Sequence, residues 1–298
     1  MGRGRIFPSA LFRKEMLIEN LIGGIQAGSL YALVALGLII IFKATSVLNF
    51  AYGEMVMMGA YFSLVFYSFL HLPLPWVFPF ALLSGTLLGL LLEMVICQPL
   101  QRASPMTIVI ATVAMMGILK SLARLIWGPG YYALPLFTVT PFQFFSLSLS
   151  GNTLYTVLIS VSFMGLFYLL FVFTKIGKGM RATSENPIAA SLMGVRIPQV
   201  FFLTWAIAGA LAALSGLLIA PLTGVFPDMG NISVKGFAAG ILGGFESVPG
   251  GILGGFFLGV AESLAGSYIS TAFKDAIAFL LLVAVLIFRP TGLFGKQG

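Results

Sequence analysis

Apolar stretches of the length of a membrane helix recur along the chain, separated by short polar segments. A membrane-spanning helix needs about 20 mostly apolar residues. Runs close to that length cover residues 21–42, 55–70, 72–92, 105–127, 153–174 and 198–220. Three further runs, residues 234–245, 248–265 and 275–288, are shorter, and the first two are rich in glycine. The pattern predicts an all-α fold, a polytopic transmembrane helix bundle of about eight or nine membrane segments with broken Gly-rich helices.

The composition agrees with a protein whose solvent is largely membrane lipid. Of the 298 residues, 59% are hydrophobic and only 8% are charged, and the mean hydropathy is +1.06. A soluble domain carries roughly a quarter charged residues. The formal charge of +7 is distributed between the apolar runs, so we expect no nucleic-acid partner. The 35 glycines fit helices that pack closely or break.

Residues that carry common enzyme chemistry are scarce. The single His and the single Cys, His71 and Cys97, cannot supply a zinc site, an internal disulfide or a Cys/His nucleophile pair. The sequence has no Gly-x-x-x-x-Gly-Lys-[Ser/Thr] phosphate loop, so ATP hydrolysis by the usual route is not expected. We therefore expect a protein that is not an enzyme and that has no catalytic residues, no metal and no cofactor.

The pattern predicts one transmembrane domain, residues 17–298, preceded by a basic extension, residues 1–16. The extension lacks the long apolar core of a signal peptide. Residues 175–196 form a clearly hydrophilic internal segment. Because Lys and Arg concentrate in cytoplasmic loops, this segment and the C-terminus are expected in the cytoplasm. The residues behind that expectation are Arg102, Lys175, Lys178, Arg181, Arg196, Arg289 and Lys296. The side of the N-terminus depends on the number of spans and stays open.

The first two apolar runs are separated by a polar segment, Asn49-Phe50-Ala51-Tyr52-Gly53-Glu54. Irregular backbone at membrane depth must line a cavity or be buried in protein, and a Glu there is costly unless it is paired. These residues are therefore candidates for a substrate path or its gate. The alternative is an ordinary cytoplasmic turn in which Glu54 is solvated.

A second candidate for the path or gate is the late Gly-rich region that begins at Lys235, with Gly236 and Gly240. Glycines let helices approach or unwind, although close packing alone would explain most of them. Glu93 and Glu262 lie at span ends, where we expect interfacial solvation. The segment Phe50-Ala51-Tyr52-Gly53 resembles Phe237-Ala238-Ala239-Gly240, which follows the sixth run. With nine spans the two copies would run in opposite directions, as in an inverted repeat.

The hydrophilic segment predicts a short helix. Ser184 or Asn186 would cap it, Pro187 would lie in its first turn and Gly194 would end it. Its apolar residues recur at helical spacing; they are Ile188, Ala189, Leu192 and Met193. Such a helix either docks into a groove on a partner or packs on its own bundle, and the residues alone do not separate the two.

Five motifs occur in the order found in the permeases of branched-chain amino-acid ABC importers, the LivH type, and the chain resembles that family over residues 17 to 296. The motifs are Asn49-Phe50-Ala51-Tyr52-Gly53-Glu54; Glu93 with Gln98-Pro99-Leu100-Gln101-Arg102; residues 177–194; residues 242–250; and Phe288-Arg289-Pro290-Thr291-Gly292-Leu293-Phe294-Gly295. Tyr52 stands where the family usually has His, and Gln98 and Gln101 stand where it usually has Arg.

The resemblance implies a multi-pass permease of the bacterial inner membrane, moving branched-chain amino acids by alternating access. It implies as partners a homologous second permease, two ABC ATPase subunits that supply the energy, an extracytoplasmic solute-binding protein and membrane lipid. Residues 175–196 would be the cytoplasmic coupling loop. The coupling residues we expect are Arg181, Glu185, Ala189, Ala190, Leu192 and Gly194, and the path or gate residues are Asn49, Phe50, Tyr52, Gly53, Glu54, Lys235, Gly236 and Gly240.

Three other functions were weighed against this one. A urea or short-chain amide ABC permease would share much of the pattern. A secondary transporter would need coupling charges in mid-span, for which Glu54 is the good candidate. A membrane enzyme has almost no support in the residues. The sequence also leaves open whether the pore is formed by two copies or by two homologous chains.

Overall fold

Helices make up almost all of the described chain. The computed structural model describes residues 10–100, 103–137, 142–144, 147–268, 270 and 274–295. The helices are α1 (Ala10–Thr45), α2 (Tyr52–Leu64) with its π-helical continuation η1 (Val65–Phe69), α3 (Leu74–Leu92), the π-helical η2 (Glu93–Cys97), α4 (Gln98–Leu100), α5 (Pro105–Trp127), α6 (Gly151–Phe173), α7 (Lys175–Glu185), α8 (Pro187–Leu192), α9 (Ile197–Thr223), the 3-10 turn η3 (Met229–Asn231), α10 (Ile232–Gly243), α11 (Val248–Tyr268) and α12 (Lys274–Phe288). Two short strands, β1 (Phe142–Phe144) and β2 (Leu147–Leu149), pair antiparallel between α5 and α6. The expectation of an all-α bundle is confirmed apart from this hairpin.

Six helices in the described ranges are long and apolar enough to cross a membrane: α1, α3 with its continuation to Leu100, α5, α6, α9 and α11. The expected eight or nine segments are therefore not confirmed. Each predicted apolar run folds into a helix. α2, which continues into η1 as far as Phe69, is not among these six, and α10 and α12 have only 12 and 15 residues. At 1.5 Å per residue such helices extend roughly 18–23 Å, less than the roughly 30 Å of a bilayer core.

Local signals set several helix boundaries. The side chain of Ser104 accepts a hydrogen bond from the backbone N–H of Thr107 at 3.3 Å, and Pro105 opens α5. Gly128 ends α5 with a φ of 80°, and Gly224 ends α9 with a φ of 74°. Glycine adopts this left-handed backbone without a steric cost.

α1 and α9 form the interior of the bundle. In α1, 78% of the most apolar stretch is buried inside the protein, whereas in α5 the share is 17%. Glycines allow the inner helices to touch backbone to backbone. A Cβ added at Gly28 of α1 would lie 2.8 Å from the Cα of Phe256 in α11, and one added at Gly209 of α9 would lie 3.1 Å from the Cα of Gly89 in α3. Close packing thus explains these glycines.

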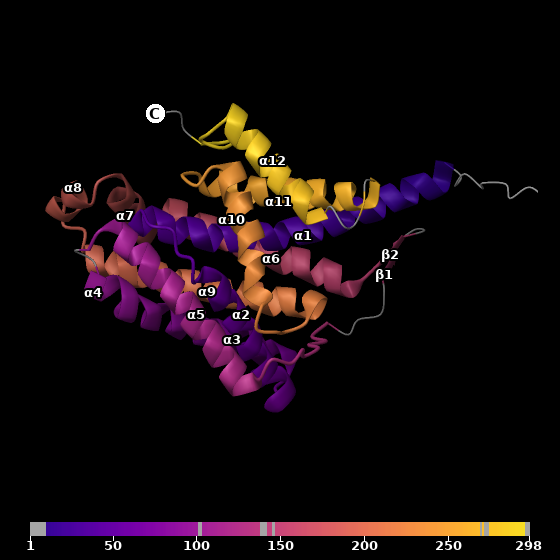
Figure 1. Cartoon of the computed structure of the whole chain (residues 1–298), viewed down its shortest axis with the longest axis horizontal. Helices are drawn as coiled ribbons and strands as arrows, with labels where there is room; N and C mark the ends of the chain where they lie inside the picture. The colour runs from indigo at the N-terminus through magenta and orange to yellow at the C-terminus, as the bar shows by residue number, and fades with distance from the viewer. Residues whose placement is uncertain are drawn as a thin grey trace, which may run out of the picture.

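The two ends of the molecule differ in structure. α4, α7 and α8 lie together at one end, and the β1–β2 hairpin lies at the opposite end (Figure 1). α10 runs across the direction of α1 in this view. Among the basic residues used for orientation, Arg102 and Lys296 lie outside the described residues, as do residues 1–9 of the extension. Residues 10–16 of the extension belong to α1.

Candidate functional site

The two polar breaks, one after α1 and one after α9, meet inside the bundle. The first covers residues 46–51 and the second residues 224–231, and each leads into a short helix, α2 or α10. A Cβ added at Gly53, in the first turn of α2, would clash with the carbonyl oxygen of Gly230 and the side chain of Ser233. The backbone approach at this contact therefore requires a glycine at position 53.

The first break has its polar groups satisfied within the protein. Ser46 has a φ of 54°, and the side chain of Asn49 accepts a hydrogen bond from the N–H of Ala51 at 2.9 Å. The N–H of Phe50 donates to the hydroxyl of Thr112 on α5 at 3.3 Å. Irregular backbone away from water needs such internal partners. Val47, Asn49 and Ala51 of this segment are buried, whereas Ser46 and Phe50 are exposed, so the segment lies partly in the protein interior.

Glu54 is buried, with 6% of its surface exposed. It lies in the first turn of α2, where the unpaired N–H groups of a helix favour a carboxylate. A Cβ added at Gly230 would lie 2.9 Å from Oε1 of Glu54, so this carboxylate lies directly against the second break.

A cavity of about 260 Å³ joins the first break to the start of α10. Its lining residues are Leu38, Leu48, Asn49, Phe50, Ser233, Val234 and Phe237. The structure thus brings Asn49 and Phe50 together with one face of α10. Tyr52 is fully buried, and its ring lies where a Cβ at Gly37 would be, so it packs against α1.

Lys235 lies on the opposite side of α10 from this cavity. It is two residues from both Ser233 and Phe237, and residues two apart project to opposite sides of a helix. Its Nζ lies 2.7 Å from Oε1 of Glu262 on α11 and 5.6 Å from the centre of the Tyr31 ring on α1.

Glu262 and Glu93 were expected at a solvated interface, and that expectation was wrong. Glu262 is 1% exposed and Glu93 is 3% exposed. Glu262, on α11, is buried because α10 and α12 close around it: Lys235 on α10 pairs with it, and Nζ of Lys274 on α12 lies 3.8 Å from its Oε1. Glu93 is buried where α3 passes into the π-helical η2.

The other two predicted glycines keep helices close. A Cβ at Gly236 would clash with Val34 of α1, and a Cβ at Gly240 would lie 3.0 Å from the ring of Phe245. They position α10 against its neighbours.

Sequence reasoning did not identify the charged cluster at the end of α5. Lys120 and Arg124 both pair with Asp228 of the second break, and Nη2 of Arg124 lies 3.3 Å from Oδ2 of Asp228. The Lys120 ammonium, which donates a hydrogen bond, holds the pKa of the Asp228 carboxyl below its usual value, with a further contribution from Arg124. The spacing of the two basic residues, four apart on one helix, was the available signal.

The hydrophilic segment folds into two helices, α7 and α8, of which only α8 was predicted. Asn186, not Ser184, caps α8: its Oδ1 accepts from the N–H of Ala189 at 3.0 Å. Pro187 opens α8, and Gly194, with a φ of 87°, follows it. α7 was missed because it is hydrophilic and carries no apolar run of helical length.

Arg181 anchors α7 to the end of α6. Its guanidinium donates to the carbonyl oxygens of Phe171 and Val172, the latter at 3.2 Å. These carbonyls are left unpaired where α6 ends, and a cation there is favourable. Arg181 therefore contacts its own bundle in this structure.

α8 presents apolar side chains on its outer side. Ile188, Leu192 and Met193 are 73%, 82% and 85% exposed. Glu185 and Ala189 are also exposed, whereas Ala190 is 5% exposed and packs within the chain. Exposed apolar residues that project from a hydrophilic segment mark an interaction surface.

Among the residues that the structure describes, no group of three or more His, Cys, Asp or Glu could hold a metal ion. At the two breaks the structure brings together amide, hydroxyl and carboxylate groups, and aromatic rings lie on the cavity wall.

Comparison with known proteins covers nearly the whole chain. Residues 20–286 match the family described as "Branched-chain amino acid transport system / permease component". The high-affinity branched-chain amino acid transport system permease protein LivH of Salmonella typhimurium is 33% identical, covering 94% of this chain and 96% of that protein. The permease protein BraD of Pseudomonas aeruginosa is 31% identical with coverage of 94% and 96%. The probable branched-chain amino acid transport permease protein LivH of Methanocaldococcus jannaschii is 28% identical, with coverage of 95% and 93%.

Proposed function

We propose that this chain, which belongs to the permease-component family of branched-chain amino acid transport systems, is the membrane subunit that conducts branched-chain amino acids through an ABC importer. It is a multi-pass membrane protein with several helices long enough to cross a bilayer. The observation that carries the proposal is similarity along 94% of the chain to a relative whose name states this transport.

The path in this proposal runs along the contact between the two breaks. Asn49 and Phe50 line it together with Ser233 and Phe237, since all four border one cavity. Glu54, Tyr52, Gly53, Gly236 and Gly240 hold the short helices that bound the path. Lys235 fixes α10 from the far side through Glu262. No tight substrate site is needed, because an extracytoplasmic binding protein supplies selectivity.

The energy comes from partner chains, one of which docks on α8. One of the two ABC ATPase subunits contacts its exposed apolar residues Ile188, Leu192 and Met193, and the other docks on the second permease. Their closure on ATP moves α8 and the anchored α7, and this motion switches the side to which the path opens. A bistable permease needs only a partner with different affinity for its two states.

The orientation and pairing follow from the same proposal. α7, α8 and the C-terminal tail lie on the cytoplasmic side of the inner membrane. The basic residues Lys175, Lys178 and Arg196 support this orientation, because Lys and Arg concentrate on that side. A second, homologous permease completes the pore. Two units consist of a long helix, a break and a short helix, α1–α2 and α9–α10. They support an internal repeat, whose inverted arrangement is part of this proposal.

Reconstitution tests the function. The chain is placed in proteoliposomes with the second permease, both ATPases and the binding protein, and uptake of labelled L-leucine is measured. Uptake should require ATP and every partner. Transport by this chain alone, or labelled urea as the better substrate of the full complex, would contradict the proposal.

The docking surface has its own test. Leu192→Asp with Met193→Asp should lower copurification of the ATPases and ATP-dependent uptake, because a charge is placed in an apolar contact. The matched control is the swap Leu192→Met with Met193→Leu, which keeps the surface apolar. Ala190 and Gly194 are poorer probes, since Ala190 is buried in its own chain and Gly194 has a positive φ. Normal copurification of the double Asp variant would place the docking elsewhere.

A further inference from the structure

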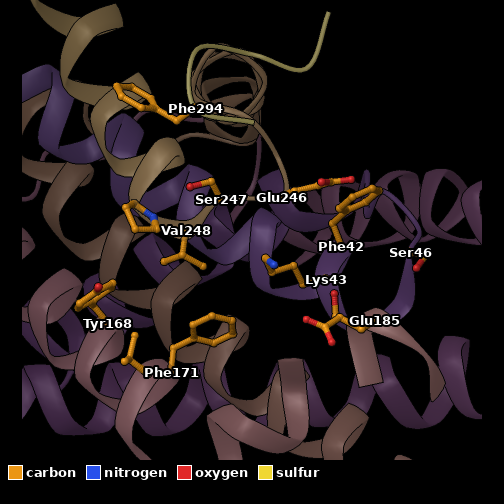
Figure 2. A pocket seen from close by; sticks show the side chains of 13 residues that line it. Phe42, Lys43, Ser46, Tyr168, Phe171, Glu185, Glu246, Ser247, Val248 and Phe294 are labelled. Atoms are coloured by element: carbon orange, nitrogen blue, oxygen red, sulfur yellow. The ribbon is translucent and has the colours of Figure 1, made fainter. Parts of the chain in front are cut away.

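A large cavity opens where α7 meets the ends of α1 and α6 and the connection between α10 and α11. Its volume is about 690 Å³, within the usual range of roughly 300–1,000 Å³ for small-molecule sites. It shares no lining residue with the cavity at the two breaks. Figure 2 shows the side chains that line it.

Charged groups of opposite sign line this cavity from different elements. Lys43 comes from the end of α1, Glu185 from the end of α7 and Glu246 from the α10–α11 connection. In Figure 2, Lys43 is drawn between Glu246 and Glu185. Ser46, Ser184 and Ser247 add hydroxyl groups to the same lining.

Aromatic rings supply the apolar part of the wall. Phe42, Tyr168, Phe171 and Phe294 all line the cavity. The Phe171 ring is held by cations: Nζ of Lys43 lies 5.9 Å and Cζ of Arg181 lies 5.3 Å from its centre. A lining with few charged groups and several rings recognises a small ligand with polar and apolar parts.

The tail that follows α12 fixes one wall to α10. The N–H of Leu293 donates to the carbonyl of Leu242 at 2.8 Å, and the N–H of Phe294 donates to that of Gly243 at 3.1 Å. These carbonyls end α10 and would otherwise be unpaired. Phe294 is thereby held at the cavity. A ligand in the cavity would contact both the end of α7 and the elements attached to α10.

We infer that this cavity binds an apolar α-amino acid, with Lys43 facing its carboxylate, Glu185 and Glu246 facing its ammonium group, and the rings facing its side chain. The inference rests on the proposed function, because it assigns a second site for the same class of molecule. A ligand there holds the α7 end and the α10–α11 connection in one arrangement. Bound amino acid therefore favours one state of the permease and slows turnover as it accumulates on the α7 side.

Inhibition by internal amino acid tests the inference. Proteoliposomes with the complete importer are loaded with ATP and millimolar L-leucine, and the initial uptake of labelled leucine is measured against vesicles loaded with ATP alone. Internal leucine should reduce the rate several-fold. Leucinamide, which lacks the carboxylate, and 4-methylpentanoate, which lacks the ammonium group, should inhibit weakly at the same concentration.

Variants assign the effect to the cavity. Lys43→Gln and Glu246→Gln should each raise the half-inhibitory concentration of internal leucine about tenfold, since each removes a charge-assisted contact. Each variant is compared with its own uptake in vesicles without internal leucine. Lys178→Gln is the matched control, because Lys178 is exposed on α7 and lines a different groove; its inhibition should match the wild type.

A binding measurement separates this inference from the proposed function. L-leucine is titrated into the purified importer complex without the binding protein, so that no transport is needed. Binding that Lys43→Gln weakens about tenfold supports the site. Absence of binding, or equal inhibition by all three compounds, overturns the site while ATP-dependent leucine uptake leaves the transport function standing.

Discussion

The interior of the bundle and the α7–α8 end use charged and apolar residues in opposite ways. The interior holds Glu54, Glu262 and most of Lys235, and the α8 end exposes Leu192 and Met193. A buried charge is costly unless it is paired, and an exposed apolar side chain in a hydrophilic segment stabilises nothing within the chain. The interior charges therefore fix the short helices, and the exposed apolar residues of α8 form the surface on which we propose that an ATPase docks.

The comparison also predicts where substitutions will destabilise the protein. Changes at the buried charges and at the contact between the breaks should lower its unfolding free energy. Changes at the exposed residues Leu192 and Met193 should leave the unfolding free energy nearly unaltered and should affect only the association with the ATPases.

Lys235→Met should cost about 3–5 kcal/mol of unfolding free energy, because it leaves Glu262 buried without its nearer cation. Denaturant titration of the purified protein in mixed micelles measures it. The double variant Lys235→Met with Glu262→Leu should recover most of the loss, since an apolar pair carries no unpaired charge. Equal destabilisation by the single and double variants would show that the ion pair is not what matters.

Gly53→Ala should cost about 1–3 kcal/mol, because the new methyl group meets the backbone of Gly230. The matched control is Gly117→Ala on α5, where nothing lies within 4 Å of the added carbon. That control should be neutral or slightly stabilising, as expected for Ala in a helix interior. Thermal midpoints in detergent compare the two, and equal midpoints would count against a tight contact between the breaks.

Asn186→Ala should cost about 1 kcal/mol locally, because α8 loses the cap that Asn186 gives to the N–H of Ala189. Hydrogen exchange of the α8 amides measures the loss, which should be confined to this helix. Asn186→Asp, which keeps a capping oxygen, is the control. Unchanged exchange in the Ala variant would mean that α8 is held by other contacts.

Leu192→Asp should change the unfolding free energy by no more than about 0.5 kcal/mol, because the side chain is 82% exposed. Its thermal midpoint should therefore stay close to that of the unchanged protein. Combined with Met193→Asp, the variant should also impair ATPase association, because charges then stand in the apolar contact. A large drop in the midpoint of the isolated chain would indicate that Leu192 packs on its own bundle.

Local signals in the sequence were sufficient for much of the fold. Some helix ends depend on only a few neighbouring residues. α5 begins at Ser104–Pro105 and ends at Gly128, and α8 is capped at Asn186–Pro187. Residues 49–54 were identified as a candidate path segment, and the structure places Asn49, Gly53 and Glu54 in the interior. Their role in transport stays a prediction.

Features that depend on helix neighbours could not be predicted. Glu262 sits near a span end, and only the packing of α10 and α12 around it makes it a buried ion-pair partner. The contact of Lys235 with Glu262 also depends on how α10 is turned, and the expected place of Lys235 on the path stays a prediction. The expected eight or nine segments are not confirmed, because an apolar run reveals a helix, whereas a crossing requires both sufficient length and sufficient hydropathy.

The hydrogen bonds from residues 293 and 294 to the end of α10 also set an order of assembly during synthesis. α10 leaves the ribosome before α11 and α12, yet two of its terminal carbonyls gain their partners only after both later helices have been made. Until then this end of α10 must rely on water or other temporary donors. Completion of the tail is therefore a late maturation step.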